Sequence, residues 1–397
     1  MKPAVNISRI LVGLLFIFSG LVKANDPLGL SYKMQEFFEL WQLSELNVHS
    51  LWLSIVIIAF EIIAGIALLL GWQMKLFSWL LLLLIIFFTF LTGYAYFSGK
   101  FKNCGCFGDC IPISAKTSFL KDVILTALIL FLFANRKKIQ PVFSKKISVI
   151  LIILSSAIAF GIQWYTLNYL PVFDCLPFKK GNNIPEKMKI PPGAVPDSFA
   201  IVFVYEKGGK QYEFAPSELP ADLNTYSFVK RSDKLIRKGN AEPPIKGFAL
   251  SGITDEDSTQ VVLSQPYAIL LFCEDFSKPV SKWKDDFEKL YTEANAKSIP
   301  VYAVTSRLAD AKKNFALTSF EDIPVFKCDY VAIRTAARTN PCLYLIKEGT
   351  VLNKWSYRNT AKAIKKVNRL VVQQKQTEKT EIPLDSIPAP LDTPKIK

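Results

Sequence analysis

The chain has a single histidine, His49, among its 397 residues. One imidazole cannot supply a His-rich metal site, so that class of centre is excluded. The sequence also lacks any C-x-x-C pair, which is the usual spacing of zinc and iron–sulfur ligands, and we expect no metal. Its seven cysteines are an odd number, so at least one thiol is free or bonded to another protein.

A concentrated basic run is missing from the second half of the chain. The formal net charge is +14, but the lysines of that half are scattered rather than clustered. Nucleic-acid-binding proteins gather Lys and Arg on one face or stripe, so no nucleic-acid partner is expected. Membrane proteins collect basic residues in cytoplasmic loops, and this accounts for part of the excess.

Long apolar runs dominate the chain up to about residue 170. A membrane-spanning helix needs roughly 17–25 apolar residues. The first run is followed by Lys23 and by further spans, so we interpret it as a retained helix rather than a signal peptide. Four predicted spans form a bundle over residues 1–138, and a fifth lies within residues 139–173. The four spans cover about residues 7–22, 51–70, 76–97 and 118–133, and the fifth is apolar over residues 147–170.

The loops predict the orientation of these spans. Residues 135–146 carry five basic side chains and no acid, which indicates a cytoplasmic loop. Counting spans from this loop places the N-terminus and residues 72–75 on the same side. The loops at residues 23–50 and 98–117, and everything after residue 170, then lie outside. We therefore expect a multi-pass protein of a bacterial inner membrane, contacting the lipid bilayer, with a cytoplasmic N-terminus and a periplasmic C-terminal domain.

Glu61 lies near the middle of the second predicted span. A carboxyl group at that depth is costly and usually indicates function, although a hydrogen-bonded acid can also join helices structurally. Both interpretations stay open. Lys23 is a candidate partner, but from the outer end of its helix it would have to reach far inward.

Three cysteines fall within residues 101–110, F-K-N-C-G-C-F-G-D-C. Outside the inner membrane thiols meet an oxidising compartment, where disulfides persist. Cys104 and Cys106 can close only a very small ring, and strained disulfides are the labile, catalytic kind. Cys110 could resolve either of them, and Cys175 lies at the same outer level just past the fifth span. A redox relay, a structural disulfide between Cys175 and a loop cysteine, and a Cys-only metal site are the three alternatives.

The first 170 residues resemble the DoxX/MauE group of small membrane proteins. That resemblance implies a helical bundle with thiol–disulfide chemistry outside the inner membrane, and it assigns Cys104 and Cys106 as the redox pair. Comparison of this group with quinone-linked enzymes makes a quinone the one cofactor to consider, by family analogy only. The fifth span and the large soluble region depart from the family pattern. The matching stretches are S-G-L-V-K at residues 19–23, D-P-L-G at 26–29, F-E-I-I-A-G-I-A-L-L-L-G at 60–71 and N-C-G-C-F-G-D-C at 103–110.

The rest of the chain has the composition of a soluble protein. Residues 174–246 are dense in Pro, Gly and Asn and contain two strand-like runs around a Gly-Gly turn, which predicts a linker and a β-hairpin. Residues 247–370 alternate strands and helices, which predicts an α/β domain. Residues 371–397 are Lys-, Thr- and Pro-rich with few large apolar side chains, so disorder is predicted.

This α/β region resembles the thioredoxin fold, with Pro341 as its cis-proline. The match fails at the active site, because C-E-D-F-S-K at residues 273–278 stands where that fold carries C-x-x-C. Ordinary thioredoxin catalysis is therefore not expected. Cys273 and Cys342 should lie near one another, as a displaced dithiol, a structural bridge or two buried thiols.

Together these features predict a helical membrane bundle followed by a degenerate thioredoxin-like domain. The first hypothesis is a thiol–disulfide relay, a candidate oxidoreductase, in which Cys104, Cys106, Cys110 and Cys175 exchange electrons with another periplasmic or membrane protein. In the alternative, the chain is a non-enzymatic assembly or maturation factor whose outer domain binds a client and whose cysteines form structural disulfides.

Overall fold

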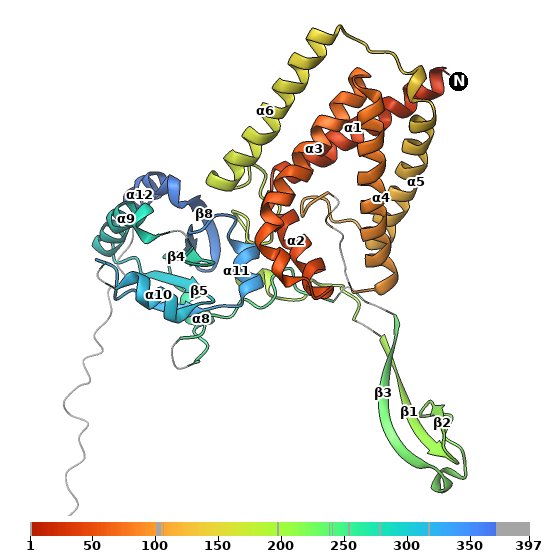
Figure 1. Cartoon of the computed structure of the whole chain (residues 1–397). Helices are drawn as coiled ribbons and strands as arrows, with labels where there is room; N and C mark the ends of the chain where they lie inside the picture. The colour runs from red at the N-terminus through yellow and green to blue at the C-terminus, as the bar shows by residue number, and fades with distance from the viewer. Residues whose placement is uncertain are drawn as a thin grey trace, which may run out of the picture.

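The computed structural model describes residues 2–100, 105, 107–196, 198–237, 239, 241–252, 255–277, 279–316 and 318–370. Cys104 and Cys106, the predicted redox pair, lie outside the described residues, and so does the predicted disordered tail at residues 371–397. Figure 1 shows a helical bundle, an α/β domain beside one end of it, and a narrow sheet that projects from the rest of the molecule.

The membrane region contains five helices long and apolar enough to cross a bilayer, counted over the described residues. The five predicted spans are confirmed as helices. They are α1 (Lys2–Ala24), α3 (Ser50–Leu70), α4 (Met74–Ser98), α5 (Ala115–Ala134) and α6 (Lys145–Tyr169). Helices α1 and α3 approach closely because of glycine: a Cβ on Gly65 would lie 2.8 Å from the carbonyl oxygen of Gly13. Small residues permit this kind of packing in lipid, where no hydrophobic force drives helices together.

The loops between the spans gather at two ends of the bundle. At one end Arg9 donates to the carbonyl of Gln140, and the amide of Val142 donates to the carbonyl of Leu70. The basic loop, the start of α1 and the α3–α4 turn therefore share that end, as the count of spans predicts. Cys110, the loop after α1 and the segment after α6, which carries Cys175, share the other end, which we call the cysteine end. Which end faces the cytoplasm stays a prediction.

Helix α2 (Pro27–Leu40) lies across the cysteine end of the bundle (Figure 1). Its N-cap is Asp26, whose side chain accepts from the amide of Gly29. Phe37 is buried, and Ser54 of α3 donates to the carbonyl of Pro27 over 2.7 Å. Helix α2 thus caps the bundle. The short 3-10 turns elsewhere are η1 (Ser44–His49), η2 (Arg136–Lys138), η3 (Leu223–Thr225), η4 (Val280–Lys282) and η5 (Tyr357–Asn359).

The projecting sheet has the order β2-β1-β3 and is antiparallel throughout. Strands β1 (Ser198–Lys207) and β2 (Lys210–Phe214) form the predicted hairpin around Gly208 and Gly209, both of which have positive φ. The third strand, β3 (Ser227–Arg237), was not predicted. Aromatic side chains of this sheet pack against one another in Phe–Phe, Tyr–Phe and Tyr–Tyr contacts. These contacts cover the sheet in place of a second layer of structure.

The α/β domain is built on a five-stranded sheet of order β6-β5-β4-β7-β8. Strands β4, β5 and β6 are parallel, whereas β7 is antiparallel to β4 and β8 is antiparallel to β7. The peptide bond between Asn340 and Pro341, directly before β7, is cis, as predicted for Pro341. This strand order with a cis-proline at that place is a thioredoxin-like fold. The strands are β4 (Ala268–Cys273), β5 (Val301–Thr305), β6 (Val325–Lys327), β7 (Cys342–Lys347) and β8 (Thr350–Ser356).

Strand β4 explains the two-sided core of this domain. All six of its residues are buried, and alternate residues join different apolar clusters. Leu270 and Phe272 face the side covered by α8 (Thr259–Leu263) and α11 (Tyr330–Ala336), and Ile269 and Leu271 face the side covered by three other helices. Those three are α9 (Lys284–Ala296), α10 (Leu308–Phe315) and α12 (Thr360–Asn368).

The segment after α6 joins the core of the same domain. Phe178 and Ile184 are fully buried in the cluster beneath α8 and α11, and the amide of Ile184 donates to the carbonyl of Gly349. Short helix α7 (Ile184–Lys187) belongs to this segment. Part of the stretch predicted as a linker therefore ties α6 directly to the thioredoxin-like domain.

Candidate functional site

A disulfide between Cys110 and Cys175 joins the cysteine loop, residues 101–110, to the segment that follows α6. Their Cα atoms are 4.9 Å apart across a sequence separation of 65 residues. Of the four predicted catalytic cysteines, the structure brings these two together. The bridge between Cys175 and a loop cysteine was one of the alternatives left open by the sequence. The roles of Cys104 and Cys106 stay predictions.

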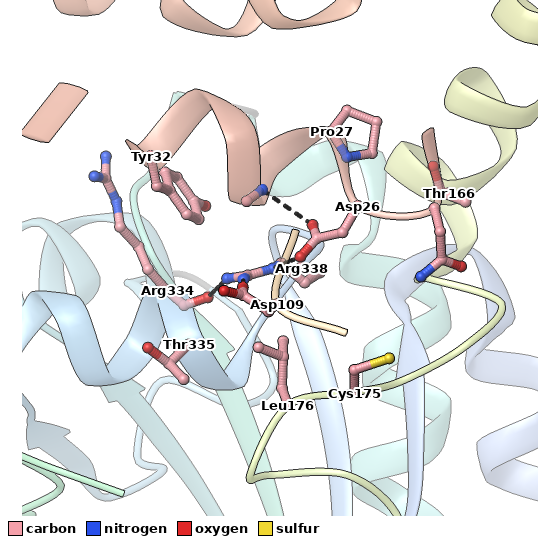
Figure 2. Close-up of polar contacts among 12 residues, drawn as sticks. Asp26, Pro27, Tyr32, Asp109, Thr166, Cys175, Leu176, Arg334, Thr335 and Arg338 are labelled. Carbon is pink, nitrogen blue, oxygen red and sulfur yellow. Dashed lines mark hydrogen bonds and ion pairs between the residues drawn. The ribbon is translucent and has the colours of Figure 1, made fainter. Parts of the chain in front are cut away.

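Arg338 of the thioredoxin-like domain holds this junction (Figure 2). Its Nε donates to Asp26 Oδ2 over 2.8 Å, and its Nη2 donates to Asp109 Oδ2, next to Cys110, over 2.9 Å. Only 5% of the Arg338 side chain is exposed. Burial alone would lower its pKa, but the carboxylates of Asp26 and Asp109 hold the pKa of Arg338 above its usual value. One buried cation thus joins the cap of α2 to the cysteine loop.

The local sequence D-P-L-G holds Asp26 in position for its ion pair with Arg338. Pro27 fixes the first turn of α2, and Asp26 Oδ1 accepts from the amide of Gly29 over 3.1 Å. A Cβ on Gly29 would lie 2.9 Å from Asp26 Oδ2, the oxygen that Arg338 uses. Glycine at this position therefore leaves room for the Asp26 carboxylate, so the stretch serves both as a helix start and as half of an ion pair.

A second set of contacts joins α2 to the end of β4. Arg334 Nε lies 2.8 Å from Glu274 Oε1, and Arg334 Nη1 donates to Gln35 Oε1 over 2.7 Å. Tyr32 donates to Glu274 Oε2 over 3.0 Å. Burial, with Glu274 beside it, raises the pKa of Tyr32, so its hydroxyl stays a donor. We call the five residues Asp26, Tyr32, Glu274, Arg334 and Arg338, together with Gln35 and Asp109, the docking interface.

Glu274 directly follows Cys273 and stands in the segment that replaces C-x-x-C. Its backbone amide donates to Oδ1 of Asn340, beside the cis-proline. The active-site end of the thioredoxin-like fold is therefore turned toward the bundle. In this chain, the position that carries redox chemistry in the fold serves as a contact between the two halves of the molecule.

The other described cysteines are free and buried: Cys273, Cys328 and Cys342. Phe272 pairs with Cys342 across β4 and β7, so Cys273 and Cys342 lie at neighbouring levels of the sheet. Their side chains belong to different apolar clusters on its two faces, and no bond joins them, so the predicted displaced dithiol is not formed. Burial raises the pKa of Cys342 to about 11 and that of Cys328 to about 12, and it raises the pKa of Cys273 further. Because the thiolate is the reactive form, these three are poor nucleophiles at neutral pH.

Glu61 forms an ion pair with Lys23, the candidate partner that the sequence left in doubt. Lys23 Nζ lies 2.5 Å from Glu61 Oε1, and Ser19 donates to Oε2 over 3.1 Å. Glu61 is 1% exposed and Lys23 4%. Charged side chains deep inside a membrane bundle are paired in this way because an isolated charge in hydrocarbon is costly.

A cavity of about 60 Å³ lies beside this ion pair. Its wall also includes Asp122, which accepts from Thr92, and Phe107 of the cysteine loop. The quinone suggested by family analogy stays a prediction.

The sequence did not indicate the docking interface. Asp26 lies in a stretch that matches the resembled family, but its ion pair was not anticipated. Arg334 lies in α11, whereas Arg338 lies two residues beyond the end of that helix, so no helical periodicity in the sequence links the two side chains. Among the described residues no group of three His, Cys, Asp or Glu side chains could hold a metal ion.

Different parts of the chain match different known proteins. Residues 1–135 match the family described as methylamine utilisation protein MauE, which confirms the expected resemblance for the bundle. Residues 199–238, the projecting sheet, match a domain of unknown function (DUF8463). "Protein TlpB" of Flavobacterium psychrophilum is 31% identical over 133 residues, which are 32% of this chain and 35% of the relative, so the match spans about a third of that protein.

Solved structures of yeast Sco1, one with copper bound, are similar to part of the chain. They are 14% and 15% identical, each has a TM-score of 0.25, and the matches cover 31% and 32% of this chain and 92% and 95% of theirs.

Proposed function

We propose that this protein is a thiol–disulfide relay of a bacterial inner membrane, with its cysteine end in the periplasm. The observation that carries the proposal is the Cys110–Cys175 disulfide, which lies at the cysteine loop and is held there by the docking interface. The thioredoxin-like domain positions this junction and recognises the partner, and its own buried thiols take no part.

The relay needs two thiol pairs. A thiolate from Cys104 or Cys106 attacks one sulfur of the Cys110–Cys175 disulfide, and the bond between Cys110 and Cys175 breaks as a mixed disulfide forms. The second thiolate of the loop pair then attacks that mixed disulfide. The loop pair ends oxidised, the Cys110/Cys175 pair ends reduced, and two electrons have moved between them. The reverse reaction uses the same steps.

A second candidate function is an assembly factor whose disulfide is a structural staple. The specific observation in its favour is that Cys273, Cys328 and Cys342 are buried, with pKa values raised by burial. In that case the docking interface and the disulfide together fix the outer domain on the bundle, and the function lies in what the outer domain binds.

Thiol trapping followed by mass spectrometry, on protein isolated from its own membranes, separates the two functions. The single variants Cys104→Ser, Cys106→Ser and Cys175→Ser are compared with the unaltered protein. The relay predicts partly reduced loop cysteines and a mixed disulfide with another protein in at least one variant. Full oxidation that resists reductant, with no cross-linked partner in any variant, would establish the staple instead.

A further inference from the structure

A cleft of about 570 Å³ opens between the bundle and the thioredoxin-like domain. Helix α2 forms one wall, helix α11 forms the opposite wall, and Cys175 with Leu176 and Pro177 lies between them. Sites that hold small molecules have volumes of roughly 300–1,000 Å³. The cleft is thus large enough for a polypeptide segment, whereas the bundle cavity of about 60 Å³ is not.

The disulfide is open to this cleft on one side only. Cys175 is exposed and lines the cleft, whereas Cys110 is partly buried and is absent from its wall. Of the two cysteines, Cys175 is therefore the one that a group inside the cleft contacts. Attack on that sulfur would release Cys110, which stays in the cysteine loop next to Asp109 and close to Cys175.

The walls of the cleft suit a polypeptide rather than a lipid chain. Glu36 and Glu39 stand on the α2 side, and Arg334 stands on the α11 side, so charges of both signs face the space. Hydrocarbon tails gain nothing from such walls, whereas an extended peptide carries donors and acceptors at every residue. Tyr330 and Val331 of α11 add apolar surface for its side chains.

We propose that this cleft binds an extended segment of a protein partner that carries two reduced cysteines, and that Cys175 is the sulfur it attacks. The inference rests on the proposed function and names the entry point of that relay. The first partner thiolate bonds to Sγ of Cys175, the bond to Cys110 breaks, and Cys110 leaves as a thiolate. The second partner thiolate then attacks the partner's bonded sulfur and releases Cys175. The partner leaves with a disulfide, and Cys110 and Cys175 retain two electrons and take up two protons.

The test compares two reductants acting on the full-length protein in lipid nanodiscs. One is a short peptide with two cysteines, and the other is dithiothreitol, which is small enough to reach the disulfide without occupying the cleft. The variant Val331→Trp narrows the cleft at a side chain that is 66% exposed. Its matched control is Val261→Trp, on α8, where the valine is 61% exposed and outside the cleft wall. Alkylation and mass spectrometry measure the rate at which Cys110 and Cys175 become reduced.

We expect Val331→Trp to slow reduction by the peptide about tenfold, the effect of losing roughly 1.4 kcal/mol of binding, and to leave reduction by dithiothreitol unchanged. Val261→Trp should change neither rate. Equal peptide rates in both variants, or a peptide found bonded to Cys104 or Cys106 rather than to Cys175, would overturn the cleft assignment while leaving the relay intact. A disulfide that neither reductant opens in the folded protein would overturn the relay itself.

Discussion

Nε of Arg338 donates to Oδ2 of Asp26 over 2.8 Å, across 312 residues of sequence. Arg338 stands three residues before the cis-proline of a thioredoxin-like domain, and Asp26 is the N-cap of the helix that covers a membrane bundle. Thioredoxin-like domains present this end to partners. Here the chain uses it on itself, and residues of the same docking interface also line the cleft.

Removing Arg338 should undock the two halves. Arg338→Gln leaves the carboxylates of Asp26 and Asp109 facing each other, and breaking a buried ion pair on one side costs about 3–5 kcal/mol. Hydrogen exchange of the α2 and α11 amides should rise in this variant. Arg231→Gln is the matched control, because Arg231 pairs with Asp233 in an exposed bridge, which contributes about 0–1 kcal/mol. Unchanged exchange at α2 and α11 in Arg338→Gln would show that the ion pairs do not hold the domain.

The contrast between the spans and the docking interface shows what local sequence can predict. Each span is a run of neighbouring apolar residues, and the hairpin around Gly208 and Gly209 is a contiguous pattern, so both follow from local rules. Strand β3 pairs with β1 across a long, polar connection and carries no such pattern. The Cys110–Cys175 and Arg338–Asp26 contacts depend on how distant segments meet, and with several cysteines and many charges the sequence allows too many pairings to choose one.

Replacing one member of the Lys23–Glu61 ion pair should destabilise the bundle more than replacing both. Glu61→Gln leaves the Lys23 ammonium buried without a counter-charge and should destabilise the bundle by about 3–5 kcal/mol. The double variant Lys23→Met with Glu61→Leu removes both charges and should recover most of that loss, because apolar replacements of buried pairs are often neutral. Thermal unfolding in detergent measures both. A double variant that is as unstable as Glu61→Gln would mean that the cost comes from packing rather than from charge.

Removing either cysteine of the Cys110–Cys175 disulfide should lower the stability of the protein as much as removing both. In the chain-entropy account, closing a loop of 65 residues stabilises by about 4 kcal/mol, and less here because the membrane helices already bring its ends together. Cys110→Ser, Cys175→Ser and the double variant should therefore lower the unfolding temperature of the outer domain equally. Dithiothreitol should lower it in the unaltered protein and not in the variants. A double variant that is less stable than either single variant would point to a second partner for one of the two thiols.

Cys342 should be unreactive in the folded protein and should make stability fall in alkali. Burial raises its pKa from 9.0 to about 11. Its folded form therefore binds a proton that the unfolded form has lost, so this stabilisation is complete below pH 9.0 and disappears as the pH rises toward about 11. Unfolding by denaturant between these pH values measures the effect, and Cys342→Ala should show a shallower loss of stability over the same range.

Alkylation gives an independent check on the same thiol. At pH 8 iodoacetamide should leave Cys342 unmodified in the native protein and modify it fully after unfolding, because only the thiolate reacts and the buried group stays protonated. Cys328, whose pKa burial raises to about 12, serves as the internal reference and should be protected in the same way. Modification of native Cys342 at the rate of an exposed cysteine, with Cys328 still protected, would mean that β7 opens locally. Cys342 would then have to be counted again among the thiols able to exchange.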